Sequence, residues 1–228
     1  MSTHSHTLAS HGEILANLPG ILGFYPNNSL ILAFFVDDEG VDTVRLGPVA
    51  RFDLDEAVEK LTESRERFAA WVHHLELDAV IAYMISDDIA QPVFDETATY
   101  LTSGASPLPP LLGVVQVPEI VTGAAWWSVY QHPLIDEPRH GVVGEVAASA
   151  ALQQMLEHTG ELPEPSKDDI EVTGSGFWYR LGGYRVLGVR VLGTGGSWVG
   201  SLWLTACAVC TRGPRNHGRS LVWSPITG

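Results

Sequence analysis

The sequence contains no hydrophobic run long enough to cross a membrane, and it has only two cysteines. Hydrophobic residues make up 45% of the 228 positions, yet the longest apolar stretch, residues 30–36, has the length of a buried strand. A membrane-spanning helix needs roughly 18 such residues in a row. Residues 1–11 are polar and lack the basic start and apolar segment of a secretory signal. The sequence therefore predicts a cytoplasmic protein with no membrane partner and no disulfide.

Motifs that identify several large enzyme classes are also absent. Residues 193–196 read Gly-Thr-Gly-Gly, but Trp198 occupies the place of the third glycine in a dinucleotide-binding fingerprint. The sequence has no Gly-Lys-Ser/Thr phosphate loop and no Gly-x-Ser-x-Gly nucleophile elbow. Cys207 and Cys210 form a lone Cys-x-x-Cys pair, short of the four ligands that structural zinc requires. We therefore predict no metal site, and the sequence assigns no cofactor.

Acidic residues are missing from the end of the chain. All 27 lie at or before Glu171, where only seven basic residues accompany them. The last 57 residues carry six arginines, no lysine and no acid, and the whole chain has a formal charge of −14. Because nucleic-acid binding depends on Lys and Arg that neutralise phosphates, the acidic body is not expected to bind nucleic acid. Solubility explains an acidic surface without any partner.

The composition of this tail predicts a boundary near residue 171. The tail holds 12 of the 23 glycines and four of the seven tryptophans. Amino acids whose codons have A at the middle position are almost absent from the tail. A GC-rich gene that is read out of frame would give such a composition. One hypothesis is therefore a frameshifted tail, and the other is a native basic segment of short strands at 184–191 and 198–209. Both divide the chain into a flexible start (1–11), a main domain (12–171) and a tail (172–228).

Hydrophobic patterning in the body alternates between strands and helices. One helical face is marked by Leu54, Val58, Leu61, Phe68, Val72 and Leu75, and Asp53 with Glu56 resembles a capping box at its start. Pro19 and Gly20 are expected to stop the first helix, and Gly160 the last. Strands are predicted at 30–36, 42–52, 79–85, 111–117 and 120–130, and helices at 11–18, 54–75, 89–101 and 142–157.

This order predicts an α/β fold, a mixed β-sheet covered by helices, in a single main domain with an atypical Gly/Arg-rich C-terminal tail. The first two strands are expected to pair in antiparallel fashion across the loop at 37–40. The Pro-rich and charged connector at 161–169 is the natural end of the domain.

Four segments of the body resemble a known family. The first is Leu22-Gly23-Phe24-Tyr25-Pro26 with Ser29-Leu30, preceded by the short helix at 14–18. The others are Arg51-Phe52-Asp53-Leu54, Trp126-Trp127-Ser128-Val129-Tyr130 and Pro165-Ser166-Lys167-Asp168-Asp169. In this order and spacing they are similar to domain-of-unknown-function family 4192, which occurs mainly in high-GC Gram-positive bacteria and their phages. The resemblance covers about residues 12–171.

The resemblance implies a fold and a lineage but no activity, because none is established for the family. Two positions depart from the family pattern. Ala125 stands where members often carry an arginine before the tryptophans, and residues 131–133 read Gln-His-Pro where members often carry Cys-Cys-Pro. Any role tied to those family residues does not extend to this chain.

Two pairs of charged residues are candidates for a site. Arg51 and Asp53 lie two apart on a strand and therefore face the same side. Arg51 could clamp an anionic ligand, or it could pair with a carboxylate while Asp53 caps the following helix. Asp87 and Asp88 follow a strand at the edge where α/β proteins usually bind ligands, and they could hold a cation or share acid and base roles. An ordinary helix cap is the structural alternative for that pair.

Further candidates come from the turn after the first helix and from the double tryptophan. Phe24, Asn27 and Ser29 could orient a ligand, although Asn and Ser also close turns routinely. If residues 126–130 form a strand, Trp126 and Trp127 point to opposite faces, and one of them is free to stack on a ligand or partner. Packing of both tryptophans beneath a helix is the alternative.

These observations lead to two functional hypotheses. The first is a non-catalytic interaction or small-ligand-binding protein of the cytoplasm, whose partner is an unidentified protein or small molecule. The second is an enzyme of unknown class with a site near residues 23–29, Arg51 and the pair Asp87–Asp88. The enzyme hypothesis requires these groups to converge in one pocket. Nucleic-acid binding through the arginine-bearing tail is a third and weaker idea.

Overall fold

The computed structural model describes the backbone of residues 6–8, 10–37 and 44–169, and of five short strands in the tail. Side chains are described for residues 10–36 and 46–169. No helix within these described residues is both long enough and apolar enough to span a bilayer.

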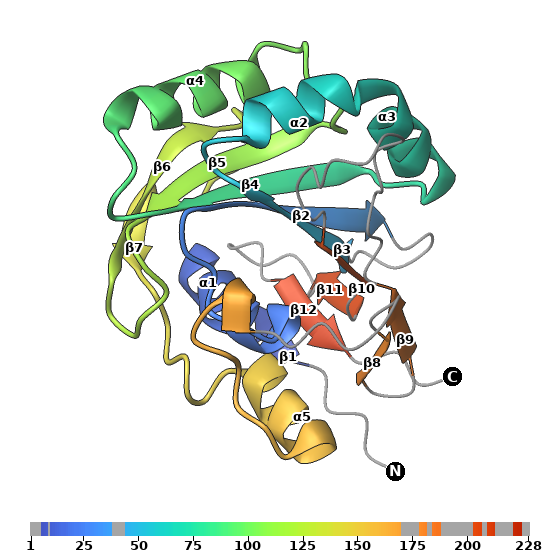
Figure 1. The fold of residues 1–228 in the computed structure, drawn as a ribbon, viewed down its shortest axis with the longest axis vertical. Helices are drawn as coiled ribbons and strands as arrows, with labels where there is room; N and C mark the ends of the chain where they lie inside the picture. The colour runs from blue at the N-terminus through green and yellow to red at the C-terminus, as the bar shows by residue number, and fades with distance from the viewer. Residues whose placement is uncertain are drawn as a thin grey trace.

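One twisted β-sheet forms the centre of the molecule (Figure 1). Its strands pair in the order β3, β2, β4, β5, β6 and β7, with β10 (Trp203–Ala206) beside β3. The pairing of β4 with β5 is parallel and every other pairing in this sheet is antiparallel, so the sheet is mixed, as predicted. The bounds are β2 (Ser29–Asp37), β3 (Val44–Asp53), β4 (Ala79–Ile85), β5 (Leu111–Val117), β6 (Ala125–Gln131) and β7 (His140–Val142).

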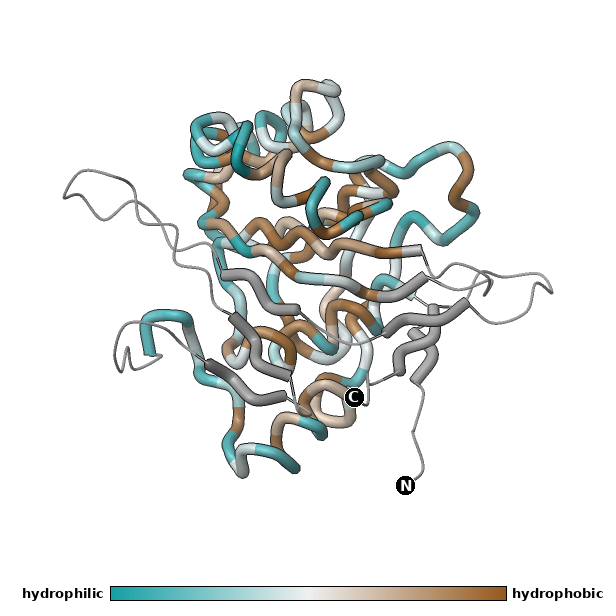
Figure 2. The backbone as a smooth tube through the Cα atoms, turned by 90° about the vertical axis from the view of Figure 1, so that its right-hand side faces the viewer, coloured by the Kyte–Doolittle hydropathy of each residue, from teal (hydrophilic) through white to brown (hydrophobic). Residues whose placement is uncertain are grey.

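Helices cover both faces of this sheet (Figure 1). On one face lie α2 (Ala57–Glu63), α3 (Arg65–His74) and α4 (Gln91–Thr102), and on the other lie α1 (His11–Leu22) and α5 (Ala150–Thr159). Strand β2 is buried on both sides because its alternating residues enter two separate hydrophobic clusters. Figure 2 shows the hydrophobic positions gathered on the central strands between the helical layers. The predicted α/β fold is therefore confirmed.

The first helix does not stop at Pro19 and Gly20, so that prediction was wrong. Helix α1 continues to Leu22 and ends at Gly23, whose φ of 79° is left-handed and whose N–H bonds to the Pro19 carbonyl at 2.8 Å. The reason lies in α5, which crosses α1 at Gly20. A Cβ atom on Gly20 would lie 2.3 Å from the backbone nitrogen of Leu152. Close helix packing therefore outweighs the hydrogen bond that a proline removes from a helix.

Two other predicted helices have different bounds. The helix expected over residues 54–75 is divided at Ser64 into α2 and α3. The apolar face is interrupted there, because no hydrophobic residue stands between Leu61 and Phe68. The helix expected from residue 142 begins only at Ala150, because residues 140–142 form β7. Gly160 ends α5 in a left-handed conformation, as predicted.

Short strands account for the described part of the tail. Strands β8 (Trp178–Leu181) and β9 (Tyr184–Leu187) pair with each other, and β11 (Val209–Arg212) pairs with β12 (Leu221–Ser224), which also pairs with β1 (His6–Leu8). None of these described strands that bear arginine enters the central sheet. Residue 207 and the glycine-rich segment 193–196 lie outside the described residues. The domain boundary near residue 171 stays a prediction.

Candidate functional site

Antiparallel pairing of β2 with β3 gathers three polar side chains on one face of the sheet. Ser29 lies opposite Asp53, and Ile31 lies opposite Arg51. Because residues two apart on a strand share a face, Ser29, Arg51 and Asp53 project toward the layer that contains α1 and α5. Lys167 reaches the same place from the 3₁₀ turn Lys167–Asp169. We call Ser29, Arg51, Asp53 and Lys167 the arginine cluster.

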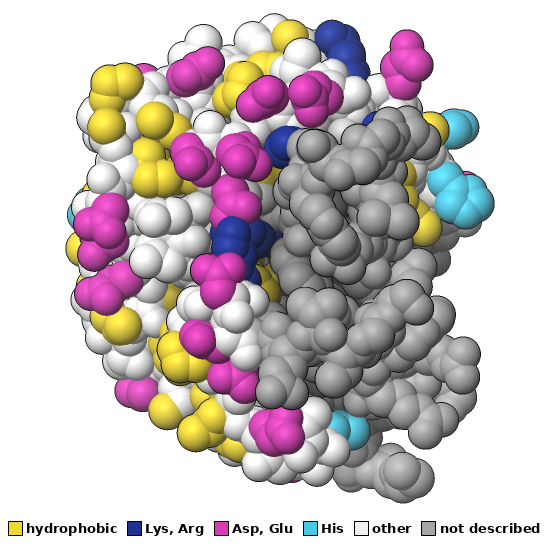
Figure 3. Space-filling view, in the orientation of Figure 1, with side chains coloured by type: hydrophobic (Ala, Val, Ile, Leu, Met, Phe, Trp, Pro, Cys, Tyr) yellow, Lys and Arg dark blue, Asp and Glu magenta, His cyan; other side chains and the backbone are white. Residues whose placement is uncertain are grey.

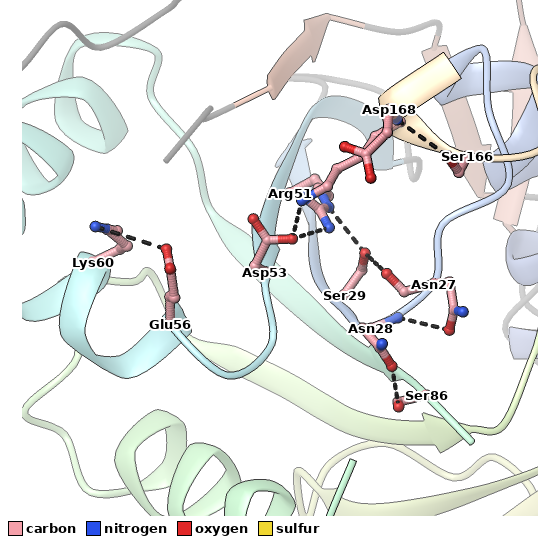
Figure 4. Close-up of polar contacts among 11 residues, drawn as sticks. Asn27, Asn28, Ser29, Arg51, Asp53, Glu56, Lys60, Ser86, Ser166 and Asp168 are labelled. Atoms are coloured by element: carbon pink, nitrogen blue, oxygen red, sulfur yellow. Dashed lines mark hydrogen bonds and ion pairs between the residues drawn. The ribbon is translucent and has the colours of Figure 1, made fainter. Parts of the chain in front are cut away.

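Arg51 is the centre of this cluster (Figure 4). Its Nε donates to Ser29 Oγ at 2.9 Å, and its Nη2 donates to Asp53 Oδ1 at 2.5 Å. Lys167 Nζ donates to the same oxygen of Asp53. The Arg51 side chain is almost fully buried, whereas those of Asp53 and Lys167 are 27% and 30% exposed. Arg51 is therefore the buried part of the cluster, and the other two charged groups form its partly exposed rim.

Asp53 stays ionised at neutral pH. Burial by itself would raise the pKa of this carboxyl, but the hydrogen bond from Lys167 and the charge of Arg51 outweigh burial and lower it below 3.8. Asp53 does not cap α2 as predicted, since the N-cap residue Glu56 makes no side-chain cap bond and the Asp53 carboxylate is used by the two cations. The cluster thus holds two positive charges and one negative charge.

One nitrogen of Arg51 is buried without a hydrogen-bond partner. A guanidinium carries five N–H donors, and the two on Nη1 are unused. Within the described part of the chain, Nη1 is the one charged group among the five buried polar side-chain atoms that lack a partner. Leaving a charged donor buried and unsatisfied is unfavourable by a few kcal/mol, so such an atom calls for an explanation.

The arginine cluster joins three of the four segments that carry the family resemblance. Ser29 belongs to the first, Arg51 and Asp53 to the second, and Lys167 to the fourth. Glu164, the residue just before the fourth segment, makes two backbone hydrogen bonds of 2.9 Å with the first segment, one to the Gly23 carbonyl and one from the Tyr25 N–H. Lys167 was not predicted as a site residue, and the only signal for it was its place in that motif.

The turn that carries Asn27 and Asn28 connects the cluster to the end of β4. Ser29 Oγ donates to the Asn27 carbonyl at 2.7 Å, and Asn28 adopts a left-handed φ of 46°. Ser86 Oγ donates to Asn28 Oδ1 and accepts backbone N–H groups from Asp88 and Ile89. This bonding fixes the turn at the carboxyl end of β4. Phe24, also predicted as a ligand contact, is buried in the core.

Asp87 and Asp88 do not join the arginine cluster. Both are exposed at the end of β4. Neither caps a helix, because α4 begins at Gln91 with Ala90 as its N-cap residue. Within the described residues, no group of three or more His, Cys, Asp or Glu side chains is placed to hold a metal ion.

The two tryptophans occupy opposite faces of β6. Trp126 is buried, donates from Nε1 to the Val142 carbonyl at 3.1 Å, and packs edge-on against His11. Trp127 is 41% exposed. The strand interpretation of this segment therefore holds, and the interpretation with both tryptophans beneath a helix was wrong.

His11, at the end of the polar segment 1–11, is a buried polar residue. Its Nδ1 lies 3.1 Å from Tyr83 Oη, and its Nε2 lies 3.3 Å from Glu137 Oε2. A carboxylate can only accept, so Nε2 carries the proton and Nδ1 accepts from the Tyr83 hydroxyl. Burial lowers the pKa of His11 to about 4, which leaves the imidazole neutral at physiological pH. The polar composition of residues 1–11 gave no indication of this burial.

Comparison with known proteins identifies the family and nothing more. No curated protein and no solved structure matches the chain significantly. The sequence model of a family described as a domain of unknown function (DUF4192) matches residues 12–174, more than two thirds of the chain. This match agrees with the resemblance of the four segments. The chain therefore belongs to the DUF4192 family.

Proposed function

We propose that this chain is a non-catalytic binding protein of the cytoplasm, in a high-GC Gram-positive bacterium or its phage, and that it holds a small ligand at the arginine cluster. The observation that carries the proposal is the buried, unpartnered Nη1 of Arg51. It lies where three separate family segments meet, and a bound acceptor would satisfy it. The lineage in this proposal rests on the family resemblance.

The chemistry of the cluster favours binding over catalysis. A nucleophilic serine needs an adjacent base, but Ser29 Oγ accepts from Arg51 and donates to a backbone carbonyl. Asp53 is a poor general base, because two cations lower its pKa far below neutral pH and both bond to the same carboxylate oxygen. The exposed pair Asp87–Asp88 does not converge on Arg51, which weakens the alternative of an enzyme.

A thermal-shift screen of nucleotides, sugars, amino acids and organic acids tests the proposal. A ligand present at 100 times its Kd stabilises the folded state by about 2.7 kcal/mol, which corresponds to about 5–10 °C for a chain of this size. The matched variant is the double substitution R51M/D53N, which removes a charged pair together and leaves no isolated buried charge. We expect at least one compound to raise the Tm of the wild type but not of this variant. Stabilisation by no compound, or equal stabilisation of both proteins, would contradict the proposal.

Protein interaction is a second candidate function, favoured by an apolar surface on β6 and β7. Trp127, Val129 and Val142 are 41%, 45% and 59% exposed. Large exposed apolar side chains that gather on one surface often mark interaction sites. An interaction there predicts that Trp127→Ala abolishes co-purification of a host protein and leaves the ligand response of the arginine cluster unchanged.

A further inference from the structure

We infer that the ligand of the arginine cluster carries an oxyanion, a phosphate or a carboxylate group, bound between Nη1 of Arg51 and Nζ of Lys167. This inference rests on the proposed function and narrows it to one ligand chemistry. Three observations support it: the unused hydrogen-bonding capacity of the cluster, its charge, and the position of Lys167 at its rim.

The unused capacity at the centre of the cluster consists of donors. Nη1 of Arg51 offers two N–H groups, and Lys167 Nζ has three donors, of which Asp53 takes one. Ser29 Oγ already accepts from Arg51 and donates to Asn27. A ligand group that fits must therefore accept several hydrogen bonds at once. Phosphate and carboxylate oxygens do so, and their hydrogen bonds to guanidinium and ammonium groups are among the strongest in proteins.

The charge of the cluster favours an anion of limited size. Two cations and one carboxylate leave a local excess of one positive charge in a body that is strongly acidic. Figure 3 shows a small patch of Lys and Arg side chains at the centre of one face, flanked by acidic side chains. Asp168 and Asp169 are exposed next to Lys167, and Asp55 and Glu56 are exposed next to Asp53. These carboxylates repel an extended polyanion, whereas a single small oxyanion can reach the two cations.

The proposed route to the buried guanidinium passes Lys167 at the rim of the cluster. It lies on a single 3₁₀ turn whose other two residues are exposed, whereas Ser29 and Arg51 lie on paired strands. Binding by this route requires that movement of this turn opens access to Nη1, which would leave the paired strands intact. The Lys167 ammonium then bonds to the ligand through the donors that Asp53 does not use. The rival explanation is a purely structural clamp that holds the three segments together and binds nothing.

Titration with simple oxyanions distinguishes these explanations. The full chain is titrated with inorganic phosphate, sulfate and acetate at constant ionic strength, with sodium chloride as the reference, and both Tm and Kd are measured. We expect saturable binding of at least one oxyanion, and its identity distinguishes a phosphate-bearing from a carboxylate-bearing ligand. Lys167→Met should weaken binding by about tenfold or more, because it removes one charged hydrogen bond. The matched control is Lys60→Met, since Lys60 lies on α2 and pairs with Glu56, apart from Arg51 (Figure 4).

Each outcome bears on one claim. Binding of no oxyanion up to about 100 mM, or equal binding by wild type and Lys167→Met, overturns the inference, the latter indicating an adventitious ion only. If the compound screen still yields a ligand that needs Arg51 but carries no oxyanion, the proposed function stands and this inference falls. If no compound of any class binds, both fall and the structural clamp remains.

Asp168→Asn, which removes a flanking negative charge, should tighten oxyanion binding, and weaker binding would count against the assignment.

Discussion

At the scale of single residues, the buried guanidinium of Arg51 and the ammonium of Lys167 share one carboxylate oxygen of Asp53. Such a network gains little net stability relative to a well-packed apolar core, yet it is sensitive to the loss of a single member. Removal of one partner leaves a charge buried and uncompensated. The arginine cluster is therefore expected to respond very differently to single and paired substitutions.

Asp53→Asn should destabilise the fold by about 2–4 kcal/mol, because Arg51 is then left buried opposite a neutral amide. The effect should fall short of that for a fully buried pair, since the Asp53 side chain is 27% exposed. The double variant R51M/D53N should be more stable than Asp53→Asn alone. Urea unfolding of the wild type, Asp53→Asn, Arg51→Met and the double variant measures these differences. A double variant that loses as much as the sum of its two single variants would contradict the network.

The buried imidazole of His11 predicts a second residue-scale effect. Its folded-state pKa of about 4 lies below the unfolded value of 6.5, so its contribution to stability is present above pH 6.5 and is lost as the pH falls toward 4. The loss amounts to a few kcal/mol. Asp53 acts in a separate window, because its lowered pKa means that its contribution is lost only below pH 3.8. His11→Gln should flatten the stability profile between pH 6.5 and 4, and an unchanged slope would show that other groups cause the acid sensitivity.

At the scale of elements, the crossing of α1 and α5 fixes one side of the sheet. Gly20 allows the backbones to touch, and Asn17 Oδ1 accepts the backbone N–H of Ala151 at 2.8 Å, which caps the first turn of α5. The sequence of one helix thus supplies the cap of another helix more than one hundred residues away. Both contacts orient the layer toward which the arginine cluster projects.

Gly20→Ala should destabilise the protein by about 3 kcal/mol or more, since the new methyl group would lie 2.3 Å from the Leu152 backbone nitrogen and neither backbone can yield easily. The matched control is Gly104→Ala, where φ is 70° but the space is open, and where about 1 kcal/mol of backbone strain is expected. Thermal unfolding compares the two variants. Equal losses would show that close helix packing is not what Gly20 provides.

Local patterns predicted the elements well and their contacts poorly. Strands β4 and β5 have the predicted bounds because short apolar runs between turn signals indicate buried strands directly. Pro19 misled the prediction, because only the presence of α5 explains a helix that continues through a proline. The site was predicted in part: Ser29 and Arg51 meet, but Lys167 is separated from Asp53 by 114 positions in the sequence. Contacts of that range depend on the assembled sheet.

At the scale of the whole molecule, the change in composition near residue 171 and the end of the family match at residue 174 coincide. All described side chains of both hydrophobic clusters precede this point. A domain with its core in one stretch of chain is expected to fold without the remainder.

A protein of residues 1–171 should therefore unfold cooperatively and still bind oxyanions. The edge of β3 that faces β10 becomes free in this fragment, so a modest loss of stability is expected. Circular dichroism during thermal unfolding, with the phosphate titration repeated, provides the measurement. A fragment without a cooperative transition would show that the tail is an integral part of the domain, and resequencing of the gene would then be expected to give an uninterrupted native frame.

The central claim is that the buried guanidinium of Arg51 binds an oxyanion. Its most direct test is nuclear magnetic resonance of the ¹⁵N-labelled side chain of Arg51 during titration with inorganic phosphate and acetate. The account predicts saturable shifts of the Arg51 side-chain N–H signals with at least one of these anions and no such shifts with chloride at the same ionic strength. Arg51 signals that do not move, or that move equally with chloride, would contradict it.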